Sequence, residues 1–148
     1  MAFTSTQNVK TYTDNLDILG DKTGNLGQLF DELQSGATNF DAVIGTTQQA
    51  IGNAAYIPQN AALVTISLPV TAPVGARLKV VGNGAGGWRI AQNAGQQINK
   101  SGATPAFTTV GTGGSFSSAN RYDAVEIVCT VANTTWVVAN GQGTHTLV

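Results

Sequence analysis

Apolar and polar side chains alternate in short stretches from residue 62 onward, and this alternation constrains the fold more than any other feature of the chain. In the strongest stretch, residues 122–131, one face carries Val125, Ile127, Cys129 and Val131. A period of two places such residues on one side of a β-strand. Segments rich in Gly, Pro and Asn separate six to eight such stretches at intervals of roughly 8–12 residues, a spacing typical of an all-β domain. We therefore predict a mainly β fold, an antiparallel β-sandwich or jelly-roll-like domain, over residues 58–148.

Residues 1–57 follow a different pattern. Between residues 24 and 52, large or apolar side chains are spaced alternately four and three apart: Leu26, Phe30, Leu33, Ala37, Phe40, Ile44, Thr47 and Ile51. This spacing is typical of helices that pack against partners along one face. Because Gly36 and the following Thr38 or Asn39 are good helix-capping residues, two short helices near 25–35 and 40–50 are favoured over one continuous helix.

The same segment provides candidate contact residues. Short helices are marginal alone in water, so their apolar faces need a partner. We expect an oligomer or capsid interface at Leu26, Phe30, Leu33, Phe40, Ile44 and Ile51. Residues 1–20 are expected to form an arm that becomes ordered against a partner, or equally to be a frayed terminus.

Charge is scarce and unevenly distributed. Charged residues make up 10% of the chain, where about 25% is usual. Residues 1–57 carry six acidic and two basic side chains, whereas residues 58–148 carry five basic and two acidic ones. Five scattered cations do not form a nucleic-acid footprint. No apolar run is long enough to span a membrane, and the first residues do not resemble a signal peptide. We therefore expect neither nucleic-acid nor membrane partners.

No group of residues predicts catalysis. Gly82, Gly84 and Gly87 match the spacing GxGxxG, but the strand-like WRIAQ follows them where a dinucleotide site needs a helix. A glycine loop that lets strands or subunits approach closely is the expected structure. His145 lies near the C-terminus and is expected to be solvated. Cys129 is the only cysteine and is expected to be a small buried apolar residue.

Asp123 and Glu126 are the only carboxylates of residues 58–148. Because they are three residues apart in one strand, they should point to opposite faces and so not converge on a substrate. We interpret them as surface charges or as partners of Arg121 and Arg89. The sequence thus predicts a protein that is not an enzyme and holds no metal or cofactor.

Trp88 and Trp136 each begin a strand after a turn. Two interpretations remain open for them. They can fill the end of the core between two sheets, or they can form an exposed platform for a sugar ring beside Asn and Gln side chains. The second interpretation makes Trp88 and Trp136 possible glycan contacts and requires at least one exposed indole.

Three blocks carry a resemblance to a known family: GARLKVVGNGAGGWRIAQNAGQQI, GTGGSFSS and YDAVEIVCTVANTTWVVANGQGT. Together they resemble a β domain found in bacteriophage virion proteins such as tail fibres and tailspikes, over roughly residues 60–143. The resemblance implies a trimeric, non-enzymatic structural or adhesion domain. Unlike most relatives, this chain has only about 57 residues before the domain and no shaft repeats.

These observations lead to two functional hypotheses. The first is a capsid decoration (cement) protein of the virion, assembled in the host cytoplasm, which docks through residues 1–57 and projects a β knob. Its partners would be itself, as a homotrimer, and the major capsid protein or another virion protein. The alternative is a short tail-associated fibre or adhesin that binds a host surface glycan.

Overall fold

The computed structural model describes residues 39–148, which belong to one compact unit, Thr38–Val148. This part of the chain is mainly β, as predicted, and contains no helix. Its strands are β1 (Phe40–Val43), β2 (Thr47–Gln49), β3 (Ala54–Pro58), β4 (Val64–Ser67), β5 (Arg77–Val81), β6 (Trp88–Ala91), β7 (Gln97–Asn99), β8 (Ser115–Ser118), β9 (Ala124–Val131), β10 (Thr135–Gln142) and β11 (His145–Leu147). The predicted helix near 25–35, with Leu26, Phe30 and Leu33, lies outside the described residues.

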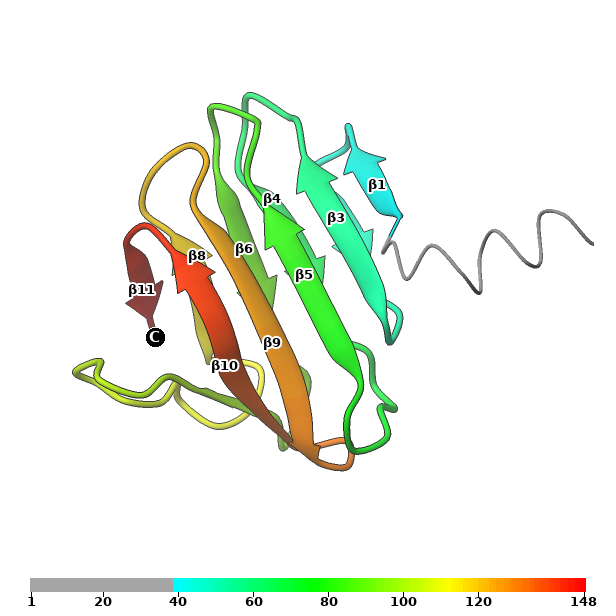
Figure 1. The fold of residues 1–148 in the computed structure, drawn as a ribbon, viewed down its shortest axis with the longest axis vertical. Coiled ribbons are helices and arrows are strands. Elements are labelled where there is room, and N and C mark those ends of the chain that lie inside the picture. The colour runs from blue at the N-terminus through cyan, green and yellow to red at the C-terminus, as the bar shows by residue number, and fades with distance from the viewer. Residues whose placement is uncertain (1–38) are drawn as a thin grey trace, which may run out of the picture. The chain divides into compact units, whose positions relative to one another are not determined.

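The strands form two sheets, seen one behind the other in Figure 1. The six-stranded sheet has the order β1-β3-β5-β9-β10-β7, and the five-stranded sheet has the order β11-β8-β6-β4-β2. From β1 to β6 the chain alternates between the sheets, so that β1, β3 and β5 pair in parallel in one sheet and β2, β4 and β6 pair in parallel in the other. This part of the chain therefore winds like a three-turn coil.

The expectation of purely antiparallel sheets is wrong, because both sheets are mixed. Five of the nine strand pairings are parallel, and the antiparallel ones are confined to β5-β9-β10 and β6-β8-β11. The physical reason is that alternation along a strand specifies which face is buried, but not the direction of the neighbouring strand.

One hydrophobic core receives side chains from both sheets. Its largest fully buried members are Trp88, Trp136, Tyr56 and Phe116. The predicted inner face of β9 is confirmed for Val125, Ile127 and Cys129, whereas Val131, at the β9–β10 turn, is exposed. No helix in the described part of the chain is long and apolar enough to cross a membrane.

The predicted helix near 40–50 is wrong, since β1 and β2 occupy this region. Val43 and Ala50 are buried there, whereas Phe40 and Ile44, which defined the four-and-three spacing, are exposed. The backbone of β1 pairs with that of β3. The spacing of apolar residues within one segment does not reveal such pairing with a separate strand. Consequently the β unit begins near residue 38 rather than 58, and Pro58 is the last residue of β3.

The glycine loop before β6 permits close backbone approach, as predicted. A Cβ atom on Gly84 would overlap the backbone carbonyl oxygen of Asn60, and one on Gly86 would overlap the backbone of Ala62. The segment that follows is the strand β6, as predicted. Five strands were not predicted: β1, β2 and β3, most of which lie within residues 1–57, and also β8 and β11. Residue Phe107 forms one isolated bridge with Asn99.

Candidate functional site

The outer face of the six-stranded sheet carries a continuous cross-strand row of side chains. Register pairs join Phe40 to Ala55, Ala55 to Lys79, Lys79 to Glu126 and Glu126 to Asn140. Residues paired in register share a face of the sheet. The row therefore runs from β1 across β3, β5 and β9 to β10, on the side away from the core.

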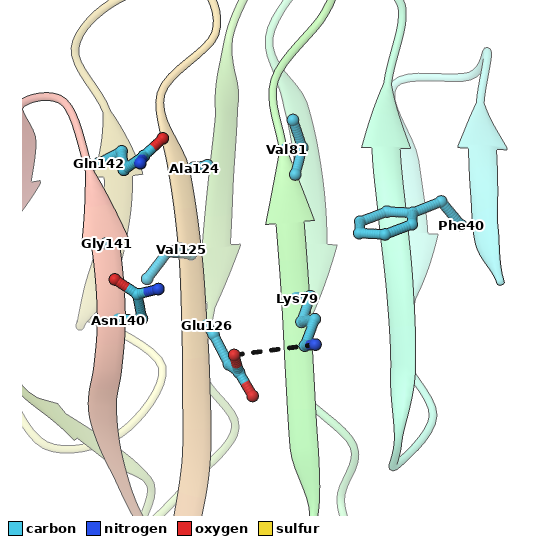
Figure 2. Close-up of a pocket in the computed structure, with 9 residues that line it drawn as sticks. All are labelled: Phe40, Lys79, Val81, Ala124, Val125, Glu126, Asn140, Gly141 and Gln142. Atoms are coloured by element: carbon cyan, nitrogen blue, oxygen red, sulfur yellow. Dashed lines mark ion pairs between the residues drawn. The ribbon is translucent and has the colours of Figure 1, made fainter. Parts of the chain in front are cut away.

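A shallow hollow of about 240 Å³ lies along this row (Figure 2). It is lined by Phe40, Lys79, Val81, Ala124, Val125, Glu126, Asn140, Gly141 and Gln142. Small residues on β9 and β10, Ala124 and Gly141, lie between the larger side chains that border it. In Figure 2 the Phe40 ring lies over β3, while Asn140 and Gln142 border the opposite side. The hollow thus combines one aromatic ring, two carboxamides and a charged pair.

The charged pair belongs to a small network on the same face. Glu126 accepts a hydrogen bond of 3.0 Å from the Arg77 guanidinium and lies 3.8 Å from the Lys79 ammonium. The sequence suggested Arg121 and Arg89 as partners of Glu126, whereas its partners in the structure are Arg77 and Lys79. Exposed ion pairs of this kind contribute little to stability. The main effect of this network is therefore to orient the Glu126 carboxylate.

Asp123 has a structural position, and the expectation of a surface charge is wrong for it. Its carboxylate is buried and accepts hydrogen bonds from the backbone N–H groups of Ala119 (3.0 Å) and Asn120 (2.8 Å). These two N–H donors lie in the turn between β8 and β9, and hydrogen bonds from them compensate the burial of the carboxylate. Asp123 and Glu126 therefore do different things and do not form a pair of acid–base groups.

Both tryptophans are fully buried, which rules out the exposed platform for sugars at these positions. The other interpretation holds: Trp88 and Trp136 fill the core between the sheets. The alternation of Trp88 with Ile90 is consistent with a buried face, but the sequence alone did not decide between the two interpretations, because the covering sheet is distant in sequence. Any glycan contact would have to lie elsewhere.

Three residues of the predicted interface lie in the described region, and all are exposed. The exposed fractions are 42% for Phe40, 77% for Ile44 and 65% for Ile51. They lie in or beside β1 and β2, which are the edge strands of the two sheets. The helical geometry expected for them is wrong, but the three side chains do belong to one end of the coil of strands.

His145 is not a solvated tail residue, as was expected. It lies on β11, where its ring stacks on Phe116 with centroids 4.9 Å apart, and its Nδ1 lies 3.2 Å from the Lys100 ammonium. Burial, followed by the charge of Lys100, lowers the pKa of His145 below 6.5 despite opposing contributions from Asp123 and the backbone of Ala124. No signal in the sequence predicted this, because β11 itself was missed.

Comparison of the chain with protein-family models and with curated proteins finds no match. Within residues 39–148, no group of three or more His, Cys, Asp or Glu side chains could hold a metal ion. Two surfaces of this region offer candidate sites: the hollow on the outer face of the six-stranded sheet and the edge formed by β1 and β2.

Proposed function

We propose that this protein is a non-enzymatic structural protein of a bacteriophage virion, namely a capsid decoration (cement) protein. Its N-terminal part, including the β1–β2 edge, docks on the particle, and the remaining strands form a β-sandwich knob. The resemblance of residues 60–143 to virion β domains supports this proposal, as do the low charge of the chain and the mainly β fold.

The observation that carries the proposal is the apolar character of the β1–β2 edge. Edge strands offer unpaired N–H and C=O groups and usually carry charges, prolines or bulges that prevent association. Here β2 (TQQ) has none of these and β1 carries one exposed charge, Asp41, whereas Phe40, Ile44 and Ile51 place large apolar side chains in solvent in or beside the two strands. Exposed apolar residues that cluster mark interaction surfaces. The partners that fit are sister subunits of a homotrimer and the major capsid protein or another virion protein.

The test replaces Ile44 and Ile51 by Ser in the full chain. Binding is measured by co-sedimentation with phage capsids from which the protein has been removed. We expect binding to weaken by about tenfold or more, since two apolar side chains no longer become buried. The matched control is Val70→Ser with Val74→Ser, two comparably exposed valines in the β4–β5 connection. Equal binding by both double variants and the natural protein would contradict docking through this edge.

Deletion experiments must respect the revised boundary. Removing residues 1–57 would delete β1, β2 and most of β3 along with the buried side chains of Val43, Ala55 and Tyr56. A truncation that tests docking by the N-terminal segment should therefore end before Asn39.

The second candidate function is a tail-associated fibre or adhesin that binds a host surface glycan. The hollow of Figure 2 favours it, because this hollow places an aromatic ring and carboxamides on one exposed face. With Trp88 and Trp136 in the core, this function depends on the hollow.

A further inference from the structure

We propose that the hollow on the outer face of the six-stranded sheet binds a short neutral oligosaccharide. This inference rests on the second candidate function, adhesion, and assigns a binding site to it. The site would use Phe40, Lys79, Glu126, Asn140 and Gln142, none of which was predicted to contact a glycan.

Phe40 supplies the apolar contact. Its ring lies over β3 and is 42% exposed, although a phenylalanine that served only stability would be buried more completely. A flat, solvent-exposed aromatic face suits the apolar C–H face of a pyranose ring, which stacks on it and releases water from both surfaces.

Asn140 and Gln142 supply the polar contacts. Each carboxamide can donate and accept hydrogen bonds, as sugar hydroxyl groups do. Both residues are exposed on β10, and within residues 39–148 neither side chain makes a hydrogen bond to another group. They lie on β10, where register pairs align Asn140 with Glu126 and Gln142 with Ala124.

Lys79 and Glu126 make the centre of the hollow polar but electrically balanced. The lining itself carries one cation and one anion, and the second cation bonded to Glu126, Arg77, lies outside the lining, so the hollow has no excess charge of its own toward a strongly acidic or basic ligand. The Glu126 carboxylate can accept hydrogen bonds and the Lys79 ammonium can donate them, so the pair can bind neighbouring hydroxyl groups of a sugar. The lining thus matches a neutral sugar better than a sialylated or sulfated one.

The dimensions favour several sugar units over one. The Phe40 ring lies over β3, and β3 and the strand of Asn140, β10, are three strand spacings apart, or about 14 Å at the usual distance between neighbouring strands. A chain of sugars lying across the strands can contact both ends. A peptide that pairs as an extra strand does not fit, because β3, β5 and β9 are already paired on both sides.

The experiment measures binding of maltotriose, cellotriose and chitotriose to the full-length protein by saturation-transfer NMR and calorimetry, after a screen on an array of neutral and acidic glycans. We expect a neutral oligosaccharide to bind. Both Phe40→Ala and the double variant Asn140→Ala/Gln142→Ala should weaken that binding by about tenfold or more. The control Phe107→Ala removes an exposed aromatic ring outside the hollow and should leave binding unchanged.

Failure of this inference can be distinguished from failure of the proposed functions. Absence of any glycan binding would overturn both the saccharide site and the adhesin function, while capsid binding could persist through Ile44 and Ile51. Glycan binding that survives the Phe40 and Asn140/Gln142 substitutions would overturn the site but leave adhesion standing. Selective binding of acidic glycans would contradict the neutral ligand.

Discussion

The indole nitrogen of Trp88 donates a 2.9 Å hydrogen bond to the backbone carbonyl oxygen of Asp123. Trp88 begins β6 in the five-stranded sheet, and Asp123 immediately precedes β9 in the six-stranded sheet. The bond therefore joins the two sheets inside the core. Trp136 is equally buried, but within the described part of the chain its indole nitrogen has no hydrogen-bond partner.

This difference between two buried tryptophans predicts different costs of substitution. Trp88→Phe removes ring volume and the hydrogen bond, whereas Trp136→Phe removes similar volume and an unpaired donor. We expect Trp88→Phe to lower the free energy of unfolding by about 1–2 kcal/mol more than Trp136→Phe does. Urea denaturation of both variants, followed by fluorescence of the remaining tryptophan and by circular dichroism, measures this difference. Equal losses would show that the bond contributes no net stability.

Gly143 and Gly75 offer a second matched pair. Both have positive φ angles, +93° and +89°, which strain any residue with a side chain. A Cβ atom on Gly143 would also overlap the carboxylate of Asp123, whereas one on Gly75 has no neighbour within 4 Å. We expect Gly75→Ala to cost about 1 kcal/mol and Gly143→Ala roughly 2 kcal/mol more. Thermal unfolding of the two variants tests the order, and a Gly75→Ala variant as unstable as Gly143→Ala would refute it.

The environment of His145 predicts a dependence of stability on pH. Burial and the neighbouring Lys100 hold its pKa in the folded protein below the ordinary value of about 6.5 that the unfolded chain keeps. As the pH falls below about 6.5, the unfolded state takes up a proton that the folded state resists, so the free energy of unfolding should decrease. Above that pH this contribution is constant.

The measurement is chemical denaturation between pH 8 and pH 5 for the natural protein and for His145→Gln. The variant should lose less stability over this range, because glutamine does not titrate. All other side chains are the same in both proteins, so the difference between the two profiles reports on His145 and its immediate surroundings. An identical pH profile for the two proteins would show that His145 does not resist protonation in the folded state.

The sequence predicted the β character and several strand faces correctly, because these depend on local alternation. The buried Val125, Ile127 and Cys129 of β9 are an example. The direction of strand pairing was not predictable in the same way. The parallel pairing of β1 with β3, and of β3 with β5, depends on contacts between segments that are separated by other strands.

The candidate sites illustrate the same limit. Phe40 and Ile44 were identified as contact residues from a helical spacing that the structure contradicts, yet both are exposed on the edge of the β unit. No pattern in the sequence singles out Asn140 and Gln142, because the hollow arises only when β10 pairs with β9 and β9 pairs with β5. For Trp88 and Trp136 the sequence left both a core position and a glycan contact open, because residue type alone does not reveal burial.

The central claim, that the protein is a capsid decoration protein, is tested most directly by locating it in intact particles. Antibodies raised against residues 39–148 can be used for immunogold labelling of purified virions in the electron microscope. We predict labelling distributed over the capsid faces. Labelling restricted to the tail would contradict the decoration function and favour the adhesin, and particles without labelling, in a preparation that contains no trace of the protein, would contradict any virion function.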